Sequence, residues 1–208
     1  MNWKNSLFYF LAFVFMSIIY SCKPQLTSQV ADFDSFFITH DTTPIRVTHI
    51  QKEDFGKYKE LDSFAIKRFN LQVLPNFPNV EYYSNKSLQP LAIGKFQISN
   101  KYTGYLIGLP HEYNWMNIVL KLYDTEKMLV SDSSYWVGAY FGDGGAEYFL
   151  ESKIEFSKNA EVKIKILESS TYLDPVAEED SLKKIELSEH EIIFQDEKFI
   201  LRKGSVTK

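Results

Sequence analysis

The clearest hydrophobic pattern in the chain is an alternation of apolar and charged residues between positions 148 and 166. It occurs on both sides of the polar stretch 158–160, and a period of two residues is typical of half-buried β-strands. A short loop at 158–160 joins the two strands in a hairpin, puts their apolar side chains on one face and sets Glu155 opposite Lys163. The two apolar sets are Tyr148, Leu150, Ile154, Phe156 and then Val162, Ile164, Ile166.

Further strands are predicted from residue 93 to the end of the chain, separated by residues that favour turns. Asp196-Glu197 is expected at a tight turn near the C-terminus. We therefore expect a mainly β fold of roughly eight to ten short strands, as a β sandwich, an open barrel or a curved antiparallel sheet. Besides the hairpin, the predicted strands are 93–99, 103–109, 117–124, 134–141, 182–187, 191–194 and 199–202.

The region before residue 91 has a mixed pattern. Residues 45–50 alternate like a strand. Residues 53–69 carry apolar side chains at positions 58, 61, 65 and 69, which favours a short amphipathic helix, although Gly56 weakens its beginning. Residues 23–32 are polar and aperiodic, which indicates a flexible tether.

The N-terminus has a different pattern, a run of 14 uncharged residues from Leu7 to Tyr20 preceded by Lys4. A spanning helix needs about 20 apolar residues, so the run is too short to cross a membrane. Its basic start and the small residue at its end are typical of a cleaved export signal. We expect a signal peptide at 1–21, a lipid anchor and tether at 22–32, and one mainly β domain at 33–208.

The end of this segment, Ile19-Tyr20-Ser21-Cys22, resembles the lipobox of bacterial lipoproteins, and its Ser-Cys ending looks like those of Bacteroidota. Tyr20 is bulkier than the pattern usually has. The resemblance implies a lipid attached at Cys22, with a thioether-linked diacylglycerol and an acyl group such as palmitate on the amine. Two or more chains hold a protein stably at a membrane. The alternative is an uncleaved anchor helix with an incidental cysteine.

The residues after Cys22 bear on where such a lipoprotein is held. An aspartate directly after the cysteine would favour the inner membrane, and an acidic cluster would favour the cell surface. Lys23-Pro24-Gln25 offers neither. We therefore expect an outer-membrane anchor with the domain facing the periplasm.

Composition narrows the function mostly by exclusion. Lys4 is the one charged residue before Cys22, so the mature chain has 22 basic and 27 acidic residues and a formal charge of −5. No stretch is strongly basic, so we expect no nucleic-acid partner. Cys22 is the single cysteine, which leaves no thiol for a disulfide or a nucleophile once it is acylated. Nucleotide-binding glycine motifs are absent, and we expect no cofactor.

The stretch Gly142-Asp143-Gly144-Gly145 is the most unusual local sequence. Its glycines would let the backbone approach a ligand, and Asp143 would then act as a base or a ligand contact. The same residues are good turn formers between two strands, and we favour the turn.

An aromatic strand precedes this stretch. Trp136 and Tyr140 are predicted on one face, on either side of Gly138, so the pair with a bare patch between them would suit a sugar ring. Core packing is the commoner role for such residues, and we favour it.

Two stretches resemble metal sites only in part. His111-Glu112 lacks the second histidine of a zinc-protease motif, because Trp115 stands in its place. Residues 157–161 lack the acids of a calcium loop. We predict no metal site.

These observations favour a non-catalytic, lipid-anchored binding module whose partner is an envelope protein, a glycan or a toxin. The competing interpretation is a small envelope hydrolase that uses Asp143 together with another acid or a histidine.

Overall fold

The computed structural model describes residues 33–41, 43–71, 87–143, 146–156, 162–173 and 183–207. By its internal contacts the chain divides into two units, residues 1–35 and 36–208, and the elements discussed below belong to the second. The predicted signal peptide, Cys22 and the tether at 22–32 lie outside the described residues. None of the helices in the described ranges has the length and apolar character needed to cross a membrane.

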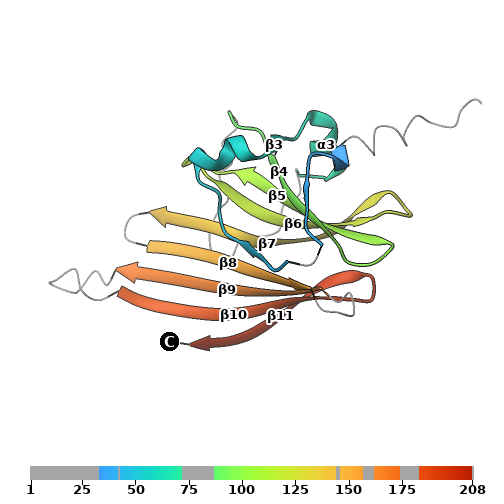
Figure 1. Ribbon diagram of the computed structural model, residues 1–208. Helices are drawn as coiled ribbons and strands as arrows, with labels where there is room; N and C mark the ends of the chain where they lie inside the picture. Colours follow the sequence, from blue (N-terminus) through green and yellow to red (C-terminus); the bar gives the residue numbers. More distant parts are fainter. Residues whose placement is uncertain are drawn as a thin grey trace, which may run out of the picture. The chain divides into compact units, whose positions relative to one another are not determined.

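The second unit is built on one sheet of eleven strands, which confirms the prediction of a mainly β fold (Figure 1). Two short helical segments accompany it. The elements are β1 Ile38–Thr39, β2 Ile45–Val47, the 3₁₀ helix η1 Lys52–Lys57, β3 Lys59–Glu60, α3 Ser63–Arg68, β4 Leu91–Gln97, β5 Tyr102–Pro110, β6 Met116–Asp124, β7 Leu129–Asp143, β8 Ala146–Phe156, β9 Val162–Leu173, β10 Lys183–Gln195 and β11 Lys198–Thr207.

The strands follow the order β1-β4-β5-β6-β7-β8-β9-β10-β11, and neighbours are antiparallel except β1 and β4. β7 is shared between the two halves of the sheet: residues 129–138 pair with β6, and residues 139–143 pair with β8. β2 pairs with residues 152–154 of β8, along the part of that strand where β7 has left. The third fold expected from sequence, a curved antiparallel sheet, is therefore the one formed.

The two halves of the sheet face each other across an apolar core. Ring contacts join strands that are not neighbours in the sheet, such as Phe96 of β4 with Phe156 of β8 at 5.8 Å and Tyr102 of β5 with Phe194 of β10 at 5.2 Å. Ile154 of β8 is fully buried between them. Burial of a side chain of this size contributes about 1.5–3 kcal/mol, so the alternating apolar face of the hairpin supports the fold directly.

The hairpin of β8 and β9 has the register that the sequence predicts, with Glu155 opposite Lys163. The predicted loop at 158–160 lies outside the described residues. The helix predicted over 53–69 forms as two pieces instead, because residues 59–60 between them pair with β4 as β3. Asp62 begins α3 by accepting a hydrogen bond of 2.8 Å from the backbone N–H of Ala65.

The tail forms two long strands rather than three short ones. Residues 183–195 are continuous as β10, and the polar residues that were expected to end a strand near position 188 lie beside a register shift instead. The turn at Asp196-Glu197 is confirmed, and both residues have positive φ, 51° and 61°.

Candidate functional site

Asp143 is the last residue of β7, and its backbone pairs with Ala146 of β8. Gly144 and Gly145, between the two strands, lie outside the described part of the chain. The side chain of Asp143 is not described either. The predicted roles of Asp143, as a turn residue, a base or a ligand contact, therefore lie outside what the structure describes.

Trp136 and Tyr140 do not form one exposed platform. Trp136 is 5% exposed and belongs to the core, whereas Tyr140 is half-buried. The patch above Gly138 is also filled: a Cβ built on this glycine would lie 2.7 Å from the carbonyl oxygen of Thr48. The protein's own chain therefore occupies the space that the sequence pattern left for a sugar ring.

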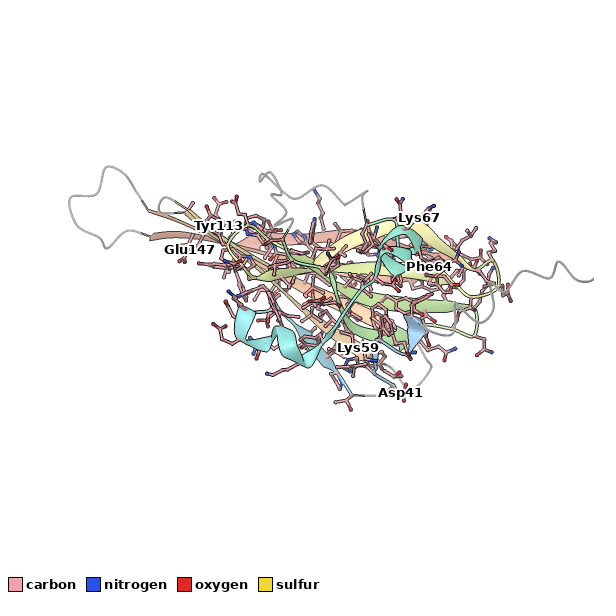
Figure 2. The ribbon with its side chains drawn as sticks, turned by 90° about the horizontal axis from the view of Figure 1, so that it is seen from above. Asp41, Lys59, Phe64, Lys67, Tyr113 and Glu147 are labelled. Atoms are coloured by element: carbon pink, nitrogen blue, oxygen red, sulfur yellow. The ribbon has the colours of Figure 1, made fainter. Side chains whose placement is uncertain are left out.

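Tyr140 instead joins an aromatic cluster formed with the turn between β5 and β6. The Trp115 indole N–H donates a hydrogen bond of 2.9 Å to the Tyr140 carbonyl, and the Trp115 ring stacks on His111 at 4.8 Å. Tyr113 stacks on Trp115 at 5.2 Å and is 48% exposed. Figure 2 shows Tyr113 at the same end of the strands as Glu147. The cluster anchors the turn to β7.

His111 is a structural member of this cluster. It is 1% exposed, and burial lowers its pKa to about 4, so the ring is neutral at neutral pH. Among the described residues, no group of three or more histidine, cysteine, aspartate or glutamate side chains is arranged to hold a metal ion. The sequence singled out His111 for its glutamate neighbour, whereas in the structure its ring packs on aromatic rings and its Nδ1 accepts a hydrogen bond of 3.5 Å from the Tyr113 backbone N–H.

A groove of about 610 Å³ crosses the outer face of β8, β9, β10 and β11, the face turned away from the core. Its lining includes one residue from the middle of each of these four strands: Ser152, Ile166, His190 and Lys203. One side of the groove is a cross-strand row in which each residue is paired in register with the next: Lys153, Lys165, Glu191 and Arg202. We call it the basic row.

The opposite side is a second row, two residues away along each strand. Glu151 of β8 is in register with Leu167 of β9, and Leu167 is in register with Glu189 of β10. Leu167 is 41% exposed. We call Glu151, Leu167 and Glu189 the acidic row. Side chains two residues apart on one face of a strand are about 6.8 Å apart along the strand, and this distance separates the two rows.

The β11 side of the groove depends on Gly204. A Cβ at this position would overlap the carbonyl oxygen of Glu189, so the two strands approach more closely than a side chain would permit. β11 has an extra residue here relative to β10, and such bulges bend a strand and strengthen its twist. His190 lies at the same place, 2.9 Å from the Glu168 carboxylate. The bulge therefore shapes the end of the groove.

Sequence reasoning missed the groove because its two rows come from four strands. The alternating charges of β8 and β9 were visible in the sequence, but they indicate only a solvated face. Their assembly into two rows depends on the pairing of β10 with both β9 and β11, and the bulge interrupts the alternation in that region.

Comparison of the chain with protein-family models, with curated proteins and with solved structures found no match.

Proposed function

We propose that the chain is a lipid-anchored cell-envelope protein that binds a partner, without catalysis, through the groove on β8–β11. The anchor is Cys22, which would hold the protein at the outer membrane with its domain in the periplasm. The partner is an envelope protein or a glycan fragment. The anchor at Cys22 thus determines where the protein is held, and the groove recognises the partner.

The groove is the observation that carries the binding proposal. Its volume of about 610 Å³ lies within the range of about 300–1,000 Å³ that is usual for ligand sites. It offers charged groups of both signs and one exposed apolar side chain, Leu167 of the acidic row. In binding sites, a small number of placed polar or charged groups fixes the orientation of the ligand.

A site-specific photocrosslink tests the groove in the native envelope. The photoreactive residue p-benzoylphenylalanine would replace Leu167 in the full-length lipoprotein. A matched control replaces Phe64 of α3, which is similarly exposed at 39%. We expect an adduct from position 167 and none from position 64. Equal adducts from both positions, or none from position 167, would contradict binding in the groove.

The anchor has its own test. Mass spectrometry of the mature N-terminus should find a chain that starts at Cys22 and carries the diacylglycerol and the acyl group. The Cys22→Ala variant should lose both the lipid and the membrane fraction. An unlipidated mature chain starting at another residue would contradict the anchor and leave the groove experiment unaffected.

A further inference from the structure

We propose that the groove on β8–β11 binds a zwitterionic ligand, a short peptide whose carboxylate is held by Arg202 and whose ammonium group is held by Glu189. This inference rests on the proposed binding role of the groove, and it names a short peptide as the ligand in place of an envelope protein or a glycan fragment. Charge pairing in the two rows carries it.

The Arg202 guanidinium is available to a ligand because its neighbour on β10 has another ion-pair partner. Its cross-strand neighbour in the basic row is Glu191, but the Glu191 carboxylate accepts an ion pair from Lys163 on β9. Within the described strands Arg202 has neither an ion pair nor a hydrogen bond of its side chain, and the side chain is exposed. A guanidinium group binds a carboxylate through two parallel hydrogen bonds, which gives both energy and orientation.

Glu189 is available for a different reason. Its neighbour in register on β9 is Leu167, which has no charge to offer. The other acid of its row, Glu151, already accepts an ion pair of 2.6 Å from Arg46. In the part of the chain that the structure describes, the Glu189 carboxylate has no cationic partner, and it lies at the exposed edge of the groove.

The other basic side chains of the basic row are engaged in ion pairs. Lys153 lies 2.6 Å from Glu155, and Lys165 lies 3.2 Å from the other oxygen of the same carboxylate. Lys203 of β11 also lines the groove, but it is in register with His190 and belongs to neither row. The two rows therefore present one available charge of each sign, on the neighbouring strands β10 and β11. A polyanion would meet the acidic row, and a polycation would meet the basic row, so neither is matched by the lining.

The spacing suits a dipeptide. The rows of Arg202 and Glu189 are about 6.8 Å apart along the strands. Two residues of extended chain span at most about 7 Å, which is close to the separation of the ammonium and carboxylate groups of a dipeptide. Leu167 lies between Glu151 and Glu189 and is exposed, so an apolar side chain of the ligand would bury it. The expected ligand is a dipeptide with one apolar side chain.

The test uses the lipidated protein purified in detergent and three probes: glycylleucine, its N-acetyl derivative and its amide. Ligand-observed saturation-transfer NMR measures their binding. We expect glycylleucine to bind and each blocked derivative to bind at least about tenfold more weakly, because a charge-assisted hydrogen bond contributes about 1.5–3 kcal/mol. Equal binding of the three probes, or no binding of any of them, would overturn the proposal.

Two variants test which residue binds the carboxylate of the dipeptide and which binds its ammonium group. Arg202→Gln should weaken glycylleucine about tenfold but leave the amide, which has no carboxylate, unchanged. Glu189→Gln should do the same for glycylleucine and leave the N-acetyl derivative unchanged. Lys57→Gln is the matched control, since Lys57 pairs with Asp54 in η1 and is not part of the groove. An equal loss for all probes in the two groove variants would overturn the assignment.

The photocrosslink separates failure of the ligand class from failure of the groove. If position 167 forms an adduct in the envelope and glycylleucine does not bind, the zwitterion is wrong and the groove still binds. If neither is observed, both proposals fail.

Discussion

Lys101 and Glu197 form an ion pair of 2.8 Å between Nζ and Oε1, joining two turns that are 96 residues apart in the chain. Lys101 lies between β4 and β5, and Glu197 lies between β10 and β11, so the pair connects the two halves of the sheet. The hydrogen bond to Glu197 is the main reason why the pKa of Lys101 is raised, and Lys101 in turn lowers the pKa of Glu197. Glu126 and Asp124 lie further from the same ammonium group, at 3.8 and 3.9 Å.

The first prediction concerns this pair. A double-mutant cycle of Lys101→Met and Glu197→Gln should give a favourable coupling free energy that shrinks as salt is raised from about 0.1 M to 1 M, since the Debye length falls from about 10 Å to 3 Å. Urea unfolding measures it. The cycle of Lys57→Met and Asp54→Asn, a local pair within η1, is the control. Zero coupling at low salt would show that the two turns are held without this ion pair.

The second prediction concerns the backbone of the same turn. Asp196 and Glu197 form a two-residue turn with positive φ at both positions, closed by the pairing of Gln195 with Lys198. Glycine adopts this conformation without steric cost, whereas other residues lose about 1–2 kcal/mol. Glu197→Gly and Glu197→Gln both remove the ion pair, so Glu197→Gly should be the more stable by about 1 kcal/mol. Equal unfolding midpoints in urea would contradict this account.

The fold was predictable where the local pattern of apolar and charged residues determines both the buried face of a strand and its register with the next strand. The hairpin of β8 and β9 is the best case, because alternation of apolar and charged residues places the buried side chains together and sets Glu155 opposite Lys163. A one-residue slip would turn every apolar side chain to solvent, so the register follows from the pattern. The turn at Asp196-Glu197 was predictable for a similar reason, since an acidic dipeptide separates two apolar segments.

The candidate site was not predictable, because it depends on contacts between distant segments. Thr48 covers Gly138 only once β2 has paired with β8, and nothing in either local sequence indicates that contact. Likewise, Arg202 is available to a ligand because Glu191 forms an ion pair with Lys163. That ion pair and the position of Arg202 beside it depend on the pairing of β9, β10 and β11.

The third prediction follows from the contact of Gly138 with Thr48. Gly138→Ala would place a Cβ 2.7 Å from a backbone carbonyl oxygen that has little freedom to move. We expect a loss of about 1–3 kcal/mol in the free energy of unfolding, as for other overpacked sites. Gly56→Ala is the control, because its Cβ would meet nothing within 4 Å, and its stability should be unchanged or slightly higher. Chemical unfolding of both variants decides the matter, and a Gly138→Ala variant as stable as the wild type would show that the segment around Thr48 moves freely.

The last prediction concerns pH. Burial lowers the pKa of His111 to about 4 from its ordinary value of 6.5, so between these values the unfolded chain binds a proton that the folded chain does not. Stability should therefore fall as pH falls from 6.5 toward 4, by roughly 3 kcal/mol from this one group, since each pKa unit corresponds to about 1.36 kcal/mol. His111→Phe keeps a ring against Trp115 and removes the titrating group, so its free energy of unfolding should depend less steeply on pH in this window. Tyr113→Phe, in the same turn, should keep the wild-type slope. Urea titrations at pH 7, 5.5 and 4 would measure the three slopes, and an identical slope for His111→Phe and the wild type would mean that the buried imidazole is not the group that the fold keeps neutral.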